Sequence, residues 1–348
     1  LKTKGYATIC IGKWHLGDQP QHLPTAHGFD EYYGIPYSND MQSARRGDPP
    51  LPLVDEKTVI EAPADQATLT QRYTKRAVEF IEKNKARPFF LYLPHTFPPL
   101  PLFASKDFHG KSANGRYGDS VEEIDWSTGQ ILDCLDRLKL SKDTVVIFTS
   151  DNGSNGRNGG SNAPLSGNKG STMEGGMRVP MIARWPGRIP ADSTCKELSS
   201  TMDFLPTFAA ISGAKLSGAK IDGFDISPLL LGKENATSPY EVFYYYRRRQ
   251  LQAIRWGDWK WHLPLEKTHP NWTTPKATGR GKPAKLYNLA KDLREKNNVL
   301  KDSPGVIKEM RKLAKQAVSS IGNDAAGGSE ARPALTLDTS APLVLKKK

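Results

Sequence analysis

Short apolar runs alternate along the first half of the chain with longer segments whose apolar residues recur at helical spacing. Residues 72–84 and 120–138 each carry one apolar helical face. Apolar runs at 6–11, 89–93 and 144–149, rich in β-branched or aromatic residues, are typical of buried strands. The last two of these strands each follow a helix, so the pattern predicts parallel pairing in an α/β sheet.

Beyond residue 239 the pattern changes to short strands separated by polar turns. These strands are predicted at 241–246, 251–255, 260–263 and 286–289. The turn sequence Trp256-Gly257-Asp258-Trp259 predicts a hairpin, and 304–319 forms one amphipathic helix. We therefore predict a large α/β domain over 1–238, a small α+β unit with an antiparallel sheet over 239–319, and a mobile basic tail over 320–348.

Composition excludes several classes of protein. With 37% hydrophobic and 25% charged residues in 348, the chain is neither disordered nor low in complexity. No apolar stretch is long enough to span a membrane, and three scattered cysteines fit neither a disulfide framework nor a zinc site. The chain starts with Leu1 without the layout of a signal peptide, so we expect it to be a fragment.

The net charge of +12 comes entirely from the C-terminal part. Residues 243–348 hold 22 Lys and Arg against 9 Asp and Glu. No aromatic and basic module of a nucleic-acid-binding protein accompanies this excess, so we expect no nucleic-acid partner. A solvated basic rim is the favoured interpretation, and attraction to polyanionic material is the alternative.

Two strand ends carry polar residues of chemical interest. Asp151 and Asn152 follow one strand and offer hard oxygen ligands of the kind that Ca²⁺ or Mg²⁺ takes; the alternative is an Asx turn. Lys13 and His15 follow another, and on an extended chain they would point to the same side, which suits an oxyanion. Taken alone, these two are more often plain surface residues.

Several ordered segments together resemble one enzyme family. Residues 5–17, GYATICIGKWHLG, resemble the second signature of the sulfatases nearly letter for letter. Further segments similar to those of arylsulfatases follow in the same order between residues 5 and 315: 27–38, 148–153, 168–180, 255–260 and 286–289. The resemblance is to formylglycine-dependent sulfatases of the arylsulfatase A-like type.

The resemblance implies an alkaline-phosphatase-like fold, a mostly parallel sheet flanked by helices, and hydrolysis of sulfate esters. It implies that Asp151 and Asn152 bind one Ca²⁺ ion, that Lys13 stabilises the formylglycine hydrate, and that His15 helps to regenerate the aldehyde. Lys169 would contact the sulfate, with the polar Ser38 beside it. The expected partner is a sulfate ester, with a sulfated polysaccharide among the candidates, and the expected location is periplasmic or secreted.

Two departures from the family pattern stand out. No Cys/Ser-x-Pro-x-Arg motif occurs in the chain, and Cys10 lies in the wrong segment to be the nucleophile. We therefore expect the nucleophile and two metal-binding aspartates upstream of Leu1, and no activity from this chain alone. In addition, Pro99 stands where the family has the histidine that protonates the leaving group. His95, four residues earlier, is a weak candidate for a substrate contact.

Three functions stay open at this stage. The first is a sulfuric ester hydrolase, and the second is a degenerate sulfatase that binds sulfated glycans through its basic rim. Phosphodiester or phosphonate hydrolysis on the same fold is less favoured because of the GKWHLG segment. The sequence leaves the substrate and the oligomeric state open.

Overall fold

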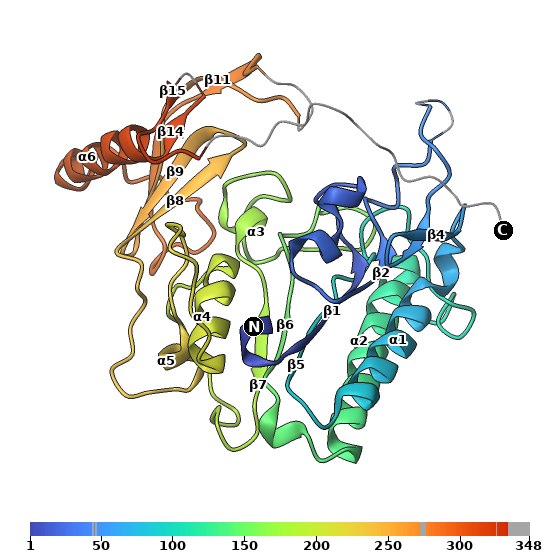
Figure 1. Cartoon of the computed structure of the whole chain (residues 1–348). Coiled ribbons are helices and arrows are strands. Elements are labelled where there is room, and N and C mark those ends of the chain that lie inside the picture. The colour runs from blue at the N-terminus through green and yellow to red at the C-terminus, as the bar shows by residue number, and fades with distance from the viewer. Residues whose placement is uncertain (44, 46, 272–275, 325, 333–348) are drawn as a thin grey trace.

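A five-stranded mixed sheet forms the centre of the larger part of the molecule (Figure 1). The computed structural model describes residues 1–348 apart from 44, 46, 272–275, 325 and 333–348. The strands lie in the order β4 (Thr58–Glu61), β3 (Leu53–Asp55), β2 (Glu31–Ile35), β1 (Ala7–Lys13) and β5 (Phe89–Tyr92). β1 pairs in parallel with β2 and β5, whereas β3 is antiparallel to β2 and β4. The sheet is thus parallel at the strands that carry the candidate site, and antiparallel at its far edge.

Two long helices, α1 (Leu69–Asn84) and α2 (Gly115–Arg137), cover one face of this sheet (Figure 1). The apolar side of α1 is buried against Ile9 and Ile11 of β1, with Tyr73 and Phe80 fully or almost fully buried. Each large side chain buried in this way stabilises the fold by about 1.5–3 kcal/mol. Both helices and the strands at 6–11 and 89–93 are confirmed.

The opposite face of the sheet is covered by the chain that follows β1 and by α4 (Phe204–Ser212). Cys10 and Tyr32 are buried there with Leu23, which lies between the 3₁₀ turns η2 (Pro20–His22) and η3 (Pro24–His27). Phe208 of α4 packs against Phe90 of β5, with ring centroids 5.6 Å apart. Helical or turn segments therefore flank both faces, and the residues of the central strands β1 and β2 are largely withdrawn from water.

The third predicted strand behaves differently from the prediction. β6 (Val146–Thr149) follows α2 but forms a two-stranded antiparallel sheet with β7 (Met181–Arg184), in register Thr149↔Met181. The chain returns from β6 through the loop at 150–178 directly alongside the strand it has left, which gives antiparallel neighbours. The expectation that this strand pairs in parallel is therefore wrong for the described residues.

The C-terminal part is an antiparallel sheet of four strands with α6 (Pro304–Ser320) packed on it. Its order is β13 (Lys285–Asn288), β10 (Trp259–His262), β9 (Gln250–Trp256) and β8 (Val242–Arg247). Leu251 and Ile254 of β9 are buried against Met310 of α6. The four strands, the hairpin at 256–259 and the helix are confirmed.

Some of the described residues of the predicted tail have regular structure. β14 (Gly322–Asn323) and β15 (Ala326–Gly327) form a small hairpin after α6. Tyr246 donates a hydrogen bond of 2.9 Å from its hydroxyl to the Gly322 carbonyl, and the Leu251 amide donates one of 3.0 Å to Asn323 Oδ1. The remainder of the predicted tail, 333–348, lies outside the described residues.

The smaller elements complete the chain. The remaining strands are β11 (Leu265–Thr268) and β12 (Gly279–Lys282), which pair with each other. The short helices and 3₁₀ turns are η1 (Lys2–Lys4), η5 (Gln66–Thr68), η6 (Ser141–Asp143), α3 (Glu174–Met177), η7 (Thr201–Asp203) and α5 (Ser227–Leu230). Within the described residues, every helix is too short or too polar to cross a bilayer.

Candidate functional site

Two glycines bring the ends of β1, β2 and β5 unusually close together. Gly12 has a φ of +125°, and a Cβ there would lie 2.0 Å from the carbonyl oxygen of Pro94. A Cβ on Gly34, its register partner, would lie 1.9 Å from the Gly12 oxygen. Only glycine permits this approach, which lets the Lys13 amide donate a 2.8 Å hydrogen bond to Pro94 O. The backbone thereby fixes where Lys13 leaves the sheet.

The chain turns sharply after Lys13. The Trp14 amide donates to Ile35 O and the His15 amide to Pro36 O, each at 3.0 Å, and His15 has a left-handed φ of 57°. The extended conformation that the sequence predicts for this segment therefore ends before His15. The pairing of Lys13 and His15 arises from this turn and from the anchoring of Trp14, whose indole N–H donates to His22 O at 2.7 Å.

Electrostatic interactions connect these two residues to groups from distant parts of the sequence. Burial lowers the pKa of Lys13, and the nearby charges of Asp151 and Asp40 oppose that shift while Lys169 adds to it. Burial also lowers the pKa of His15, and the charge of Lys13 lowers it further. The imidazole is therefore neutral at neutral pH and able to accept a proton. Charges from Asp40, Asp151 and Lys169, which lie in distant parts of the sequence, thus act on both Lys13 and His15.

Sequence reasoning missed Asp40, which acts on both Lys13 and His15. Its segment is held by Asn39, which is fully buried and donates from Nδ2 to Gln66 Oε1 at 2.9 Å and to Pro101 O at 3.0 Å. Ser38 lies in the same segment, three residues past β2, and its carbonyl accepts from the Met41 amide. The signal that could have found Asp40 is the polar run Ser38-Asn39-Asp40 directly after a strand that neighbours β1.

A glycine-rich loop over 150–178 carries Asp151, Asn152 and Lys169. The Gly153 amide donates to Gly176 O at 3.1 Å, and a Cβ on Gly153 would lie 1.9 Å from Gly175 O. Farther along, the Lys169 amide donates to Ser154 O at 2.9 Å. These backbone contacts fold the loop tightly on itself. As a result Asn152 and Lys169, which are 17 positions apart in sequence, line the same space.

That space is a small cavity of about 100 Å³. Asn152 and Lys169 line it from the loop, and Tyr246 and Arg247 line it from the end of β8. A larger cavity of about 450 Å³ lies along the same loop, lined by residues 160–168 together with Arg294 and Lys296. The C-terminal part therefore supplies cations beside both cavities.

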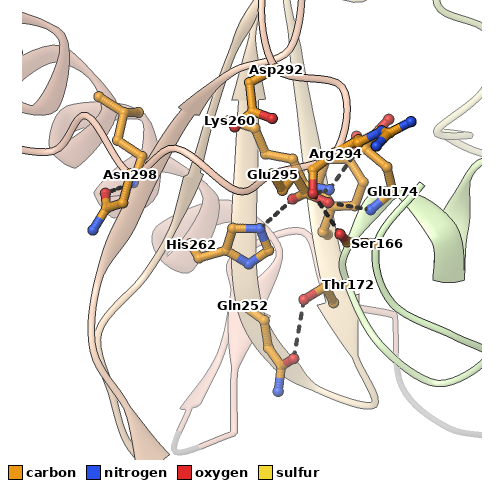
Figure 2. A network of polar contacts seen from close by, with 12 residues as sticks. Ser166, Thr172, Glu174, Gln252, Lys260, His262, Asp292, Arg294, Glu295 and Asn298 are labelled. Atoms are coloured by element: carbon orange, nitrogen blue, oxygen red, sulfur yellow. Dashed lines mark hydrogen bonds and ion pairs between the residues drawn. The ribbon is translucent and has the colours of Figure 1, made fainter. Parts of the chain in front are cut away.

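A buried network of charged groups joins the loop to the C-terminal sheet (Figure 2). Lys260 of β10 is 0% exposed, and its ammonium lies 2.7 Å from Glu174 Oε1 and 3.2 Å from Glu295 Oε1. The second oxygen of Glu295 accepts from the Glu174 amide at 2.6 Å, and His262 Nε2 lies 2.7 Å from Glu295 Oε1. Both carboxylates thus have cationic or N–H partners, as buried charges require.

The protonation states of the network follow from these contacts. Burial alone would raise the pKa of Glu295, but its hydrogen bond to His262 and the charge of Lys260 outweigh burial and hold the pKa below its usual range. Burial lowers the pKa of His262, which the bond to Glu295 only partly offsets. At neutral pH Glu295 is therefore ionised and bridges a cation and a neutral imidazole.

His95 lies at the end of β5, next to the backbone of Lys13, but no described contact joins its ring to the cluster. Its Nδ1 is buried and has no hydrogen-bond partner among the described residues. Burial lowers the pKa of His95 to about 4. The ring is therefore neutral at neutral pH, and the predicted substrate contact of His95 stays a prediction.

Comparison with known proteins identifies two matched regions. Residues 1–214 match the family model described as sulfatase, and residues 238–334 match the C-terminal region of aryl-sulfatase. The chain is 42% identical over 279 residues to the N-acetylgalactosamine-6-sulfatase of Canis lupus familiaris, covering 76% of this chain and 53% of that protein. It is 35% identical to human arylsulfatase A over 351 residues, covering 91% of this chain and 69% of that one. The chain spans about half the length of the first of these relatives.

Solved structures agree with the fold. A sulfatase from Pseudoalteromonas sp. superimposes with a TM-score of 0.79 at 27% identity, covering 91% of this chain and 71% of that one. A protein described with glycosaminoglycan metabolism in Bacteroides thetaiotaomicron superimposes with a TM-score of 0.78 at 27% identity, covering 91% and 80%. A phosphonate monoester hydrolase from Silicibacter pomeroyi, at 15% identity and a TM-score of 0.60, shares the fold alone.

The electrostatic coupling of the cluster gives a first prediction. Lys13→Met removes a cation that lowers the pKa of His15, so the pKa of His15 should rise; Asp40→Asn removes an anion that raises it, so the pKa should fall. NMR titration of the imidazole measures both shifts, with the exposed and distant Lys85→Met as control. Unchanged titration of His15 in both site variants would contradict the cluster.

The buried network gives a second prediction. Lys260→Met leaves two buried carboxylates without their cation, so the free energy of unfolding should fall by about 3–5 kcal/mol. The matched control is Lys312→Met, which breaks an exposed pair with Glu309 and should cost about 1 kcal/mol or less. Urea unfolding followed by fluorescence measures both. Equal effects of the two substitutions would show that the network contributes no more than a surface ion pair.

The buried imidazole of His95 gives a third. Between pH 6.5 and about 4 the unfolded chain binds a proton at His95 that the folded chain does not, so the free energy of unfolding falls as the pH drops. The loss reaches at most about 3 kcal/mol near pH 4. His95→Gln should remove this part of the pH dependence, whereas His109→Gln, at an exposed histidine, should leave it. A pH profile of stability that His95→Gln does not flatten would rule out the buried neutral ring.

Proposed function

The chain belongs to the sulfatase family, and from that premise we propose that it forms the sulfate-holding part of an enzyme that hydrolyses sulfate monoesters. The observation that carries the proposal is the electrostatic coupling of Lys13 and His15 to Lys169 and Asp151. The ammonium groups of Lys13 and Lys169 repel each other. An oxyanion that binds between them relieves this repulsion and is stabilised by both charges.

Each residue of the cluster has a role in this proposal. Lys169 binds a sulfate oxygen, and Lys13 neutralises the charge that develops on the attacking side. His15, neutral at neutral pH because burial lowers its pKa, accepts a proton. Ser38, in the segment that Asn39 anchors, is assigned a polar contact beside the sulfate.

The proposal includes a Ca²⁺ ion. The carboxylate of Asp151 and the side-chain amide oxygen of Asn152, adjacent at the start of the loop, are hard oxygen donors of the type that calcium takes. Among the described residues, no cluster of three or more His, Cys, Asp or Glu could hold a metal, so these two donors are a partial set. When bound, the ion would supply positive charge to one sulfate oxygen.

The nucleophile is assigned to no residue of this chain. The family's formylglycine arises within a Cys/Ser-x-Pro-x-Arg motif, which is absent from the 348 residues. Pro99 has no proton to give, and the imidazole of His95, with a pKa of about 4, carries no acidic proton at neutral pH. Neither residue can therefore protonate the leaving group, so hydrolysis of an ester with a poor leaving group, such as a sugar hydroxyl, needs a general acid from outside the loop over 94–101.

The substrate class proposed is a sulfated saccharide. The cavity of about 450 Å³ beside the loop, with Arg294 and Lys296 in its wall, has room for sugar units and attracts anions. A periplasmic or secreted location accompanies the proposal and rests on family membership alone.

The test uses 4-methylumbelliferyl sulfate, with 4-methylumbelliferyl phosphate and 4-methylumbelliferone as comparisons. In the protein as its gene encodes it, Lys169→Met should lower kcat/KM for the sulfate ester by about 10²-fold or more, because one donor to the oxyanion is lost. Lys85→Met is the control for the loss of one positive charge. Binding of the sulfate ester to the 348-residue chain, followed by fluorescence, should show the same loss in Lys169→Met.

Two results would contradict the proposal. Equal hydrolysis by wild type and Lys169→Met would remove Lys169 from the site. A preference for the phosphate ester over the sulfate ester would favour phosphoryl chemistry on the same fold.

A further inference from the structure

Arg247 stands in the wall of the cavity that also contains Lys169 and Asn152, although it comes from the C-terminal sheet. It is the last residue of β8 and pairs with Gln250 across a two-residue turn made of Arg248 and Arg249. Its two neighbours in the turn are exposed, whereas Arg247 is half-buried. Of the three consecutive arginines, one therefore faces the candidate site, and the basic rim is not uniformly solvated.

The position of Arg247 is fixed by an irregularity in the β8–β9 hairpin. Tyr245 is opposite Ala253 and Tyr246 is opposite Leu251, so Gln252 is an extra residue on β9. Such bulges bend a strand and redirect the side chains next to them. Here the bulge precedes Arg247 by two residues, close enough to set the direction in which the turn leaves the sheet.

The extra residue also attaches the hairpin to the loop of the site. Gln252 is 4% exposed, and its Oε1 accepts a hydrogen bond from Thr172 Oγ1 at 3.3 Å. Thr172 itself lines the small cavity, three residues after Lys169. The β8–β9 hairpin is thus joined to the loop by Gln252, and β10 is joined to it by the contact between Lys260 and Glu174 (Figure 2).

The chemistry of the cavity suits an anion. A guanidinium offers a planar fork of N–H donors that matches oxyanions, and it stays charged at every relevant pH. At about 100 Å³ the cavity is far below the volume of a site for a whole sugar, and it suits a single charged substituent. Lys169 is among the residues that line the cavity and Lys13 is not, so the scissile sulfate assigned to these two lysines lies at the edge of the cavity, and a group that Arg247 binds inside it lies beside that sulfate.

We propose that Arg247 is a specificity residue that binds a second oxyanionic substituent, a second sulfate, on the saccharide whose scissile sulfate is held by Lys169. This inference rests on the proposed function and extends it, because it selects multiply sulfated sugars over monosulfated ones. Arg247 takes no part in the bond-breaking step, so it should govern affinity rather than the chemical step.

The experiment compares galactose 6-sulfate with galactose 4,6-disulfate by isothermal titration calorimetry on the 348-residue chain. Wild type should bind the disulfate about tenfold more tightly, the effect of one charge-assisted hydrogen-bonding pair. Arg247→Gln should abolish that ratio and leave the dissociation constant for the monosulfate within about twofold. Arg247→Lys keeps the positive charge but lacks the planar set of guanidinium donors, so it should retain part of the affinity ratio between disulfate and monosulfate.

The matched control is Arg249→Gln, which removes the same charge from an exposed position two residues away and should leave the ratio unchanged. Thermal unfolding checks that each variant keeps the wild-type fold. In the active protein, Arg247→Gln should raise KM for the disulfate with kcat unchanged, which a merely structural role would not do.

The outcomes separate this inference from the function on which it rests. Failure of wild type to bind either sugar sulfate would overturn the proposed function and this inference with it. Binding of both sugars with equal affinity, or a ratio that survives Arg247→Gln, would overturn this inference alone. Equal weakening of both sugars by Arg247→Gln would place Arg247 on the scissile sulfate and would also overturn it.

Discussion

The buried ammonium of Lys260 is the interaction on which the arrangement of the candidate site depends. It lies between Glu174, which begins α3 at the end of the site loop, and Glu295, which belongs to the C-terminal part. The ring of Tyr245 lies 4.3 Å from the same ammonium and adds a cation–π contact. A fully buried lysine is tolerated only when such partners are all present, so the ion pairs form only when loop and sheet are assembled together. The C-terminal sheet is therefore a structural part of the site.

A second constraint acts on the side of the central sheet. The close approach of Gly12 to Pro94 and of Gly34 to Gly12 places three strand ends within backbone contact. Lys13 follows this point at the end of β1. Lys169, on the loop over 150–178, is close enough to act on the pKa of Lys13. The charges of Asp40 and Asp151 act on Lys13 and oppose the effect of Lys169 on it. Backbone hydrogen bonds hold both segments in place. The side chains of Lys13 and Lys169 are therefore available to bind an anion.

The sequence predicted the parts of this structure that depend on local pattern. The two long helices, the strands that contain Ile9 and Phe90, and the C-terminal hairpin at Gly257 follow from periodicity and turn chemistry. Resemblance to the sulfatases brought Lys13, His15, Asp151 and Lys169 into one group. Neither local pattern nor family resemblance predicted the long-range pairing of strands. Nothing in the apolar residues around Ile147 shows that this strand pairs with β7 instead of with the central sheet. Arg247 was missed for the same reason, since it lies in no motif and only tertiary contacts bring it to the cavity. Asp40 was missed although a polar run directly after a strand could have indicated it.

We propose that Lys13 and Lys169, from segments more than 150 residues apart, form one oxyanion site. A crystal structure of the chain soaked with tungstate, a heavy tetrahedral stand-in for sulfate, tests it most directly. We expect one anion within about 3 Å of both ammonium groups, as charge-assisted hydrogen bonds require. An anion bound elsewhere, or a structure in which Lys13 and Asp151 lie on opposite faces of the sheet, would contradict it.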